Sequence, residues 1–286
     1  VIQVPRDRKS EFEPVVVPKH QSRGLSIERL VISLYAKGMS VSDIESEMQE
    51  IYGINLSTSA ISIITNKVSQ AASEWQNRPL ESLYMIVWMD GIVFKVRENG
   101  KVINKTVYLC VGLNKEGLKE VLGMWVGKNE SAAFWMGVLT DLKARGVEDI
   151  LITVTDNLNG FTETIKSVFP TSTTQICVVH QIRNSCRYVV WKEKKEFTSD
   201  LKNIYNAPTK EAAKMELENF EQKWGTKYPY AIRSWRNNWE ELTVFFDFPV
   251  EIRKIIYTTN LIENLNGKIR KYTKNCLLYT SDAADE

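Results

Sequence analysis

The sequence has no long apolar run, few cysteines and only two histidines. Because a membrane-spanning helix needs about 20 apolar residues, the lack of any such run excludes that class of protein. Four cysteines, widely separated among 286 residues, do not make the disulfide framework of a secreted domain. No secretory signal peptide is recognisable either. The sequence therefore predicts a protein of the reducing cytoplasm with no membrane partner.

Net charge is also nearly absent, at +2 for the whole chain, but it is unevenly distributed. Residues 157–274 hold 19 basic and 13 acidic side chains, whereas residues 1–80 hold 9 of each. This excess of positive charge in the second half favours a polyanionic partner there. With 43% hydrophobic and 25% charged residues, the chain is expected to form one large globular domain or two small ones.

The N-terminal third has helical periodicity. Residues 1–24 hold three prolines among mixed charges, and we expect an extended arm or linker there. Three helical patterns follow in residues 25–78, with turns at Lys37-Gly38 and at Gly53-Ile-Asn-Leu-Ser57. This is the plan of a helix-turn-helix domain, whose later helix enters the major groove of DNA. The third helix is expected to bury Ile61, Ile64, Val68, Ala71 and Trp75.

A helix-turn-helix domain would present a polar face at the start of that third helix, where side chains can bond phosphates or base edges. A small helical bundle with a polar face is an equal alternative, because residues 1–80 carry no net charge. The candidate DNA-binding residues are Ser57, Thr58, Ser59, Ser62, Asn66 and Lys67.

From residue 79 onward the pattern predicts strands. Leu83–Met89 is almost continuously apolar, as a strand buried on both faces should be, and we expect it to stop at Asp90-Gly91. An Asn-Gly hairpin turn at residues 98–101 and a second turn at residues 114–117 then predict three consecutive antiparallel strands.

A helix, a strand, a helix and a last strand complete the pattern. The second of these, Ile150–Thr155, ends at Asp156. This order is that of a ribonuclease H-like domain, an α/β fold with a mixed sheet and carboxylates on the first strand and at the end of the fourth. Asp90 and Asp156 fall at about those places, and the two strands would be neighbours. Each aspartate alone also fits an ordinary turn.

A final helical stretch, Tyr257–Lys274, carries a third carboxylate. Asn260 is a good N-cap, and Glu263 completes a capping-box pattern. Glu263 and Arg270 share a face that Lys274 extends, so this helix is able to hold a metal ion beside a phosphate backbone. A glutamate at this position also serves as a simple cap. The apolar side is formed by Leu261, Leu265 and Ile269.

Several short motifs follow one another along the chain. They are Pro5-Arg-Asp-Arg8, Glu11-Phe-Glu-Pro14, Trp88-Met-Asp90, Thr155-Asp156, Gly160-Phe161, Gln175-Ile-Cys-Val-Val-His180, Arg183-Asn184, Ser234-Trp-Arg-Asn-Asn-Trp-Glu-Glu241, Phe245-Phe-Asp-Phe-Pro249, Tyr257-Thr-Thr-Asn260 and Ile262-Glu263. In this order and at these separations they resemble the mutator-type transposases of bacterial insertion sequences, from residue 1 to about residue 274.

The resemblance implies a ribonuclease H-like catalytic core over residues 79–190, a helical insertion over 191–255 and a last core helix over 256–274. The sequence supports the insertion independently, because residues 192–246 have helical patterns. In one of these, Glu211–Trp224, many charged residues are mixed with the apolar residues Ala212, Met215, Phe220 and Trp224. The i,i+4 pair Trp235 and Trp239 predicts packing rather than base stacking.

The resemblance also implies an activity. Asp90, Asp156 and Glu263 would be an acidic triad that holds Mg²⁺ or Mn²⁺ in a DNA transposase, which cleaves the ends of its element and transfers the 3′-OH into target DNA. Its partners would be double-stranded DNA, at the terminal inverted repeats and the target, and at least one more copy of the chain. No small-molecule substrate is expected, and the site of action would be the bacterial nucleoid. The residues expected to hold backbone phosphate are Lys268, Arg270, Lys271 and Lys274.

Cys177 and His180 match a Cys-x-x-His element of the family, which favours a supporting catalytic role for His180 at the edge of the active site. As a zinc site this element is incomplete, since two further ligands are needed. Cys186 is one candidate ligand, and His20 is the only other histidine. A packed cysteine with a hydrogen-bonded histidine is the simpler alternative.

Two features depart from the family. Asn157-Leu-Asn159 follows Asp156 where the family usually has glycine, and residues 275–286 look like non-native read-through. With Val1 as its first residue, the chain is expected to be a fragment. Three other functions stay open: a nuclease of the same fold without strand transfer, a DNA-binding regulator that uses only residues 25–77, and an inactive remnant.

Overall fold

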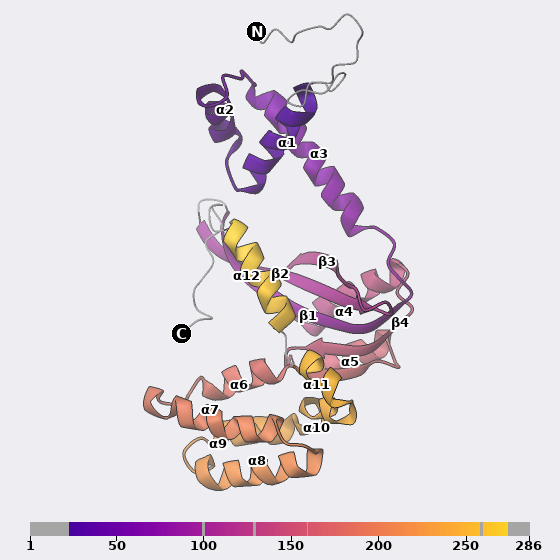
Figure 1. The fold of residues 1–286 in the computed structure, drawn as a ribbon, viewed down its shortest axis with the longest axis vertical. Coiled ribbons are helices and arrows are strands. Elements are labelled where there is room, and N and C mark those ends of the chain that lie inside the picture. The colour runs from indigo at the N-terminus through magenta and orange to yellow at the C-terminus, as the bar shows by residue number, and fades with distance from the viewer. Residues whose placement is uncertain (1–22, 99–100, 128–129, 159, 258–259, 274–286) are drawn as a thin grey trace, which may run out of the picture. The chain divides into compact units, whose positions relative to one another are not determined.

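The structure is a computed structural model that describes residues 23–98, 101–127, 130–158, 160–257 and 260–273 (Figure 1). Internal contacts divide the chain into two compact units, residues up to Ser73 and residues from Glu74 onward. The predicted arm, residues 1–24, lies almost wholly outside the described residues, as does the predicted read-through tail, residues 275–286. None of the described helices is long and apolar enough to cross a membrane.

The N-terminal unit consists of three helices, α1 (Arg23–Ala36), α2 (Val41–Glu50) and α3 (Thr58–Gln76). Helix α2 begins with a capping box, because the Ser40 hydroxyl accepts a hydrogen bond from the Asp43 amide and the Asp43 carboxylate accepts one from the Ser40 amide. The small core contains Val31, Ile44, Met48, Ile61 and Ile64.

The expected apolar stripe of α3 is correct only in its first half. Ile61 and Ile64 are buried and Val68 is half-buried, but Ala71 is exposed. Among the described residues, Ile64 is the last residue of α3 that belongs to the core with α1 and α2. Helical periodicity shows which side of a helix is apolar, not how far its partner extends.

The second unit is built on a five-stranded mixed sheet with the order β3-β2-β1-β4-β5. β1 pairs antiparallel with β2 and parallel with β4, and β4 pairs parallel with β5. This is the ribonuclease H-like α/β arrangement predicted from the sequence. The strands are β1 (Leu83–Glu98), β2 (Lys101–Asn114), β3 (Lys119–Gly127), β4 (Asp149–Thr155) and β5 (Thr173–Ile176).

β1 does not stop at Asp90-Gly91, which corrects the prediction. Asp90 pairs with Leu109 and Gly91 with Tyr108, so the ladder with β2 continues without a break to Glu98. The Asp-Gly pair resembles a turn in sequence, but Gly91 is needed here for close packing. A β-carbon at Gly91 would lie 2.9 Å from the Thr106 side chain. Asp90 is therefore held inside a long strand rather than at the tip of a loop.

The two faces of the sheet carry different helices. One face packs Val87 and Met89 against Trp135 of α4 (Ala132–Ala144) and Phe161 of α5 (Phe161–Val168). The other face packs Trp88 into the helices that follow β5, and the Trp88 indole nitrogen donates a hydrogen bond to the Ile255 carbonyl over 3.2 Å. Because side chains alternate along a strand, Asp90 lies on the same face as Trp88.

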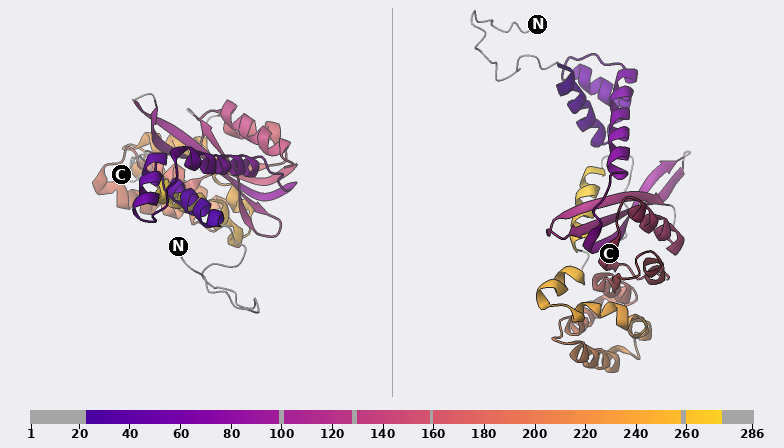
Figure 2. Two further views of the ribbon diagram at one scale, coloured as in Figure 1. Left: turned by 90° about the horizontal axis from the view of Figure 1, so that it is seen from above. Right: turned by 90° about the vertical axis from the view of Figure 1, so that its right-hand side faces the viewer.

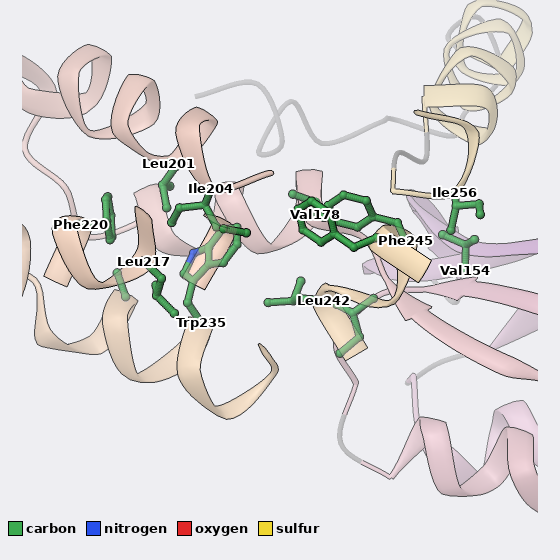
Figure 3. Packing of buried hydrophobic residues seen from close by; sticks show 14 of the residues in the cluster. Val154, Val178, Leu201, Ile204, Leu217, Phe220, Trp235, Leu242, Phe245 and Ile256 are labelled. Atoms are coloured by element: carbon green, nitrogen blue, oxygen red, sulfur yellow. The ribbon is translucent and has the colours of Figure 1, made fainter. Parts of the chain in front are cut away.

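The chain after β5 is helical, and Figures 1 and 2 show it extending from the edge of the sheet and returning along β1 as α12. The larger core of this unit includes Leu201, Phe220 and Trp235 (Figure 3). The elements are α6 (Val178–Cys186), α7 (Trp191–Tyr205), α8 (Lys210–Trp224), α9 (Pro229–Asn237), α10 (Trp239–Leu242), the 3-10 helix η1 (Val244–Asp247), α11 (Val250–Ile256) and α12 (Asn260–Thr273).

The apolar residues of α8 are not all buried. Phe220 and Trp224 are buried, but Ala212 is only half-buried and Met215 is 65% exposed. Ala213 and Leu217 are also buried, because these two residues continue the i,i+4 and i,i+3 spacing back from Phe220. The Trp235–Trp239 pair is packed, as expected: Trp235 is buried and its indole nitrogen donates to the Ser185 hydroxyl over 2.9 Å.

A buried glutamine joins the last strand to the helical region. The Gln175 amide nitrogen donates to the carbonyls of Ile176 and Leu242, over 2.7 and 2.9 Å, and its oxygen accepts from the Phe245 amide over 2.8 Å. Every polar atom of this fully buried side chain is therefore satisfied, and β5 is held against α10 and η1.

We predict that Gln175→Leu lowers the free energy of unfolding by about 2–4 kcal/mol, because it leaves a backbone amide and two carbonyls buried without partners. Urea unfolding followed by circular dichroism measures this loss. Gln222→Ala, at an exposed position of α8, is the control and should change stability by less than about 0.5 kcal/mol. Equal stability of Gln175→Leu and the parent chain would contradict the role assigned to this side chain.

Candidate functional site

The parallel register between β1 and β4 brings two aspartates together. Trp88 pairs with Val154, and two residues further along each strand lie Asp90 and Asp156. Since successive pairs in a parallel ladder stay in register, the two carboxylates come side by side although they are 66 positions apart in the chain. Asp156 directly follows the last residue of β4, where the strand opens into a loop.

Asp90 is held on both of its oxygens. Its Oδ1 accepts a hydrogen bond from the Gly91 amide over 2.8 Å, and its Oδ2 accepts one from the Asn266 side-chain nitrogen over 2.9 Å. The side chain is almost completely buried, with the residue 6% exposed. Burial, together with the neighbouring charge of Asp156, raises the pKa of Asp90 to about 7.

His180 comes from the first turn of α6, which begins where β5 ends. The Cys177 amide donates to the Thr155 carbonyl over 2.8 Å, which places the start of α6 beside the end of β4. The Nδ1 of His180 forms an ion pair with Oδ1 of Asp156. Burial alone would lower the pKa of His180, but the hydrogen bonds with Asp156 and with Cys177 outweigh it and raise the pKa to about 11.

These three residues form a cluster with the composition of a metal site. One ligand atom from each of Asp90, Asp156 and His180 lies within 4.8 Å of the others. Two carboxylates and an imidazole are suitable donors for a divalent cation. Beside them, the buried Oδ1 of Asn266 has no hydrogen-bond partner. Two adjacent carboxylates, a raised pKa for Asp90 and an unpaired amide oxygen nearby are together the features expected of a site for a divalent cation.

A small pocket of about 180 Å³ opens beside Asp156. Its lining is predominantly polar, and includes Glu163 of α5 and Glu241 of α10 in addition to Asp156. The negative charge of this lining favours the binding of a cation over the binding of an anion. Of the residues near this pocket, Asp156 both lines it and approaches Asp90 and His180.

Glu263 does not belong to the cluster. It lies in the first turn of α12, half-buried, and its Oε1 forms an ion pair with Arg183 of α6 over 2.7 Å. The structure therefore brings together Asp90 and Asp156 of the predicted triad with His180, and shows the third carboxylate bound to an arginine instead. The expected cap interaction of Asn260 concerns a side chain outside those that the structure describes, and α12 begins at Asn260 itself.

The basic residues of α12 lie in different environments. Lys268 and Lys271 are exposed and able to meet a phosphate backbone, whereas Arg270 is half-buried. Lys274 lies outside the described residues. The apolar side of α12 contains Ile262, which is fully buried, with Leu265 and Ile269 partly buried. The sequence pattern missed Ile262.

The candidate DNA-binding residues of the N-terminal unit lie at the surface around the start of α3, which is the position expected for a helix-turn-helix reader. Lys67 forms an ion pair with Glu28 of α1 over 2.8 Å, so its charge is partly neutralised in this structure. Ser62 is half-buried, and the exposed residues are Ser57, Thr58, Ser59, Asn66 and Lys67.

No zinc site forms around Cys177 among the described residues. Cys177 and Cys110 are buried and Cys186 is half-buried, and none of these three is in a disulfide. The cluster that contains His180 takes its other members from aspartates rather than from cysteines. The packed-cysteine alternative agrees with these contacts, because Cys177 is fully buried and hydrogen-bonds His180.

Comparison with known proteins places this chain in a family. The family described as "Transposase, Mutator family" matches residues 1–285. The chain belongs to the Mutator family of transposases.

Relatives within this Mutator family come from several bacteria. The chain is 44% identical over 282 residues to the "Probable transposase for insertion sequence element ISRM3-like" of Sinorhizobium fredii, covering 98% of this chain and 70% of the relative. It is 38% identical over 282 residues to a "Probable transposase for insertion sequence element" of Corynebacterium diphtheriae, covering 98% and 82%. The predicted resemblance is confirmed.

Solved structures are more distant. A Drosophila P element transposase strand transfer complex is 9% identical, covers 86% of this chain and 87% of that chain, and has a TM-score of 0.27. A simian T-cell lymphotropic virus intasome in complex with PP2A regulatory subunit B56 gamma is 14% identical, covers 70% and 67%, and has a TM-score of 0.26. At these scores the fold assignment depends on the strand order described above.

Two residues of the site had no role in the sequence-based prediction. Arg183 was part of a matched motif, but nothing in the sequence pairs it with Glu263. Asn266 lies three residues after Glu263 and therefore on the same side of the helix, which is a signal that could have identified it. Only the approach of α12 to β1 shows that its side chain reaches Asp90.

The raised pKa of Asp90 predicts a stability that falls with pH when divalent ions are removed. Between about pH 4 and pH 7 the unfolded Asp90 is ionised while the folded one keeps its proton, so the folded state binds more protons. Stability from this group is then complete below about pH 4 and is lost as pH rises toward 7. The slope is on the order of 1 kcal/mol per pH unit.

Urea unfolding in EDTA at pH 4.5 and pH 5.5 measures this slope, in a range where His180 is largely protonated in both the folded and the unfolded state. We expect Asp90→Asn to flatten the dependence. Asp247→Asn, at an exposed position, is the control and should leave it unchanged. An identical slope in Asp90→Asn and the parent chain would show that Asp90 titrates normally.

Proposed function

We propose that this chain is a metal-dependent DNA transposase that cleaves the ends of its element and joins the resulting 3′-OH to target DNA. The observation that carries the proposal is the meeting of Asp90 and Asp156 on adjacent parallel strands, with His180 beside them, in a chain of the Mutator family. Carboxylates that are far apart in the sequence, close together in the fold and partly buried are typical of a catalytic cation site rather than of a structural one.

Asp90 and Asp156 would hold the cation, with His180 or Glu263 completing the site. Mg²⁺ is the expected ion and Mn²⁺ the natural substitute, because hard carboxylate oxygens dominate the donor set. When bound, such ions supply Lewis-acid stabilisation of the attacking and leaving oxygens in phosphoryl transfer. The protonated His180 offsets part of the negative charge of the two aspartates in the structure described here.

Glu263 takes part in this proposal after a local change. Its ion pair with Arg183 is half-exposed, and such pairs contribute about 0–1 kcal/mol. A contact this weak exchanges readily for a cation or for a DNA phosphate at Arg183. Glu263 would then be free to complete the acidic triad, and Arg183 would hold the substrate backbone.

The reaction would consist of two displacements at phosphorus. In the first, water attacks the phosphodiester at the element end, a P–O bond forms to the water oxygen, and the bond to the 3′ oxygen breaks to give a 3′-OH. In the second, that 3′-OH attacks a phosphodiester of the target, and the target's own 3′ oxygen leaves. Neither step forms a covalent bond between protein and DNA.

Contacts with DNA would come from both units. The exposed polar residues at the start of α3 would read the terminal inverted repeats, and the exposed lysines of α12, Lys268 and Lys271, would hold backbone phosphate without regard to sequence. Arg270 and Lys274 are proposed for the same role. Two element ends must be joined to one target, so a homodimer or larger assembly on DNA is the proposed working unit, in the bacterial cytoplasm at the nucleoid.

Two other functions give different products. A nuclease of the same fold would leave nicks alone, whereas a transposase gives joined molecules in which element DNA is covalently attached to the target. A DNA-binding regulator would bind DNA equally well with Mg²⁺ or with EDTA and would not need the three carboxylates. An assay with labelled element ends and a circular target plasmid separates these functions.

We predict that Asp90→Asn, Asp156→Asn and Glu263→Gln each reduce strand cleavage by about 10²- to 10³-fold or more while binding of element ends stays within about threefold. The reason is that each change removes a negative charge from the cation site and leaves the DNA-binding unit intact. Gel assays of cleavage and fluorescence anisotropy of binding, both with Mg²⁺, measure the two effects.

Glu251→Gln and Asp247→Asn are the matched controls, since both are exposed acidic residues outside the cluster. They should cleave like the parent chain. Normal cleavage by any one of the three site variants would remove that residue from the proposed triad. Loss of end binding together with loss of cleavage would indicate misfolding instead.

A further inference from the structure

Asn266 lies at the centre of contacts between α12 and the candidate cation site. The residue is 8% exposed and is three positions after Glu263, so the two side chains emerge from the same side of the helix. Its side-chain nitrogen donates to Oδ2 of Asp90 over 2.9 Å, across 176 positions of sequence. Within the described residues, this hydrogen bond joins α12 directly to Asp90, the member of the cluster that lies on β1.

The contact fixes the orientation of Asp90. With the Gly91 amide on Oδ1 and the Asn266 amide on Oδ2, the carboxylate cannot rotate without losing a buried hydrogen bond. Asp90 is therefore held in one orientation before any ligand binds.

The other atom of the same amide is unsatisfied. Oδ1 of Asn266 is buried and has no hydrogen-bond partner. Buried polar atoms are nearly always paired in folded proteins, so an unpaired acceptor on a side chain that hydrogen-bonds Asp90 marks a place for a missing ligand. Amide oxygens of asparagine are regular ligands of hard divalent cations.

We propose that Asn266 is a positioning residue of the cation site, which holds Asp90 in its ligating orientation through Nδ2 and offers Oδ1 as a further neutral oxygen to the bound group. The proposal rests on the proposed function, in which the cluster binds a divalent cation. Neutral residues that orient metal ligands typically change metal affinity by about 10- to 100-fold when they are lost.

A second buried amide provides the matched control. Gln181 of α6 is 1% exposed, its nitrogen donates to the Ser234 hydroxyl over 2.8 Å, and its Oε1 also lacks a partner. Its hydrogen bond joins two helices and involves no carboxylate. Gln181→Leu therefore removes a buried amide of the same kind without touching the ligands of the cluster.

The experiment measures Mn²⁺ binding to the 286-residue chain by the electron paramagnetic resonance signal of free Mn²⁺. The variants are Asn266→Leu, which keeps the volume of the side chain, Asn266→Ala, Gln181→Leu and Asp90→Asn. Thermal unfolding of each in EDTA and in Mn²⁺ is recorded in parallel. We expect Asn266→Leu and Asn266→Ala to raise the Kd for Mn²⁺ by about 10- to 100-fold, and Gln181→Leu to leave it within twofold.

The outcomes separate this inference from the proposed function. If Asn266→Leu and Asn266→Ala lower the Tm in EDTA but bind Mn²⁺ within twofold of the parent chain, Asn266 has only a structural role. If the parent chain binds Mn²⁺ no more tightly than Asp90→Asn does, the proposed cation site is wrong. The role proposed for Asn266 is then wrong as well. If one Asn266 variant fails to fold, the Kd of the other variant for Mn²⁺ decides between these outcomes.

Discussion

The candidate site depends on the parallel pairing of β1 with β4. A shift of one residue in that register would turn Asp156 to the opposite face of the sheet from Asp90, because side chains alternate along a strand. The pairing is stabilised by large apolar residues on both faces, including Val87 toward α4 and Trp88 toward the helical region. Burial of these side chains therefore sets the position of two carboxylates that lie far apart in the chain.

The C-terminal helices are held to that sheet by polar contacts next to the site. Trp88 donates to the Ile255 carbonyl, the Val178 amide donates to the Tyr257 carbonyl over 3.1 Å, and Asn266 donates to Asp90. Each contact joins α11, its C-cap Tyr257 or α12 to an element that carries a residue of the cluster. The helix with Glu263 thus approaches the aspartates although the whole helical region separates it from β5 in sequence.

Much of the fold follows from local patterns in the sequence. The Asn-Gly turn and the apolar run Leu83–Met89 predicted the antiparallel strands, and the switch to helical spacing after β5 predicted the helical region. Local patterns failed where partners decide the outcome. Asp90-Gly91 has the sequence of a turn, yet pairing with β2 keeps both residues in the strand. Ala71 was expected on the buried side of α3, yet it is exposed.

The site could be predicted only in part for the same reason. Two aspartates that follow apolar runs are visible in the sequence, and so is a histidine just after the last strand. The ion pair of Arg183 with Glu263 and the hydrogen bond of Asn266 with Asp90 are not, because both join side chains from elements that approach only in the folded chain. Tertiary contact, rather than spacing, determines them.

The central claim is that the carboxylates of this Mutator-family chain gather around a divalent cation. Anomalous X-ray diffraction from crystals grown with Mn²⁺ tests it most directly, since the manganese positions are seen independently of the protein atoms. The account predicts an anomalous peak in contact with Asp90 and Asp156, with Glu263 released from Arg183 and turned toward it. A well-ordered site without manganese, with the Glu263–Arg183 pair intact in crystals of a chain that cleaves DNA, would contradict it.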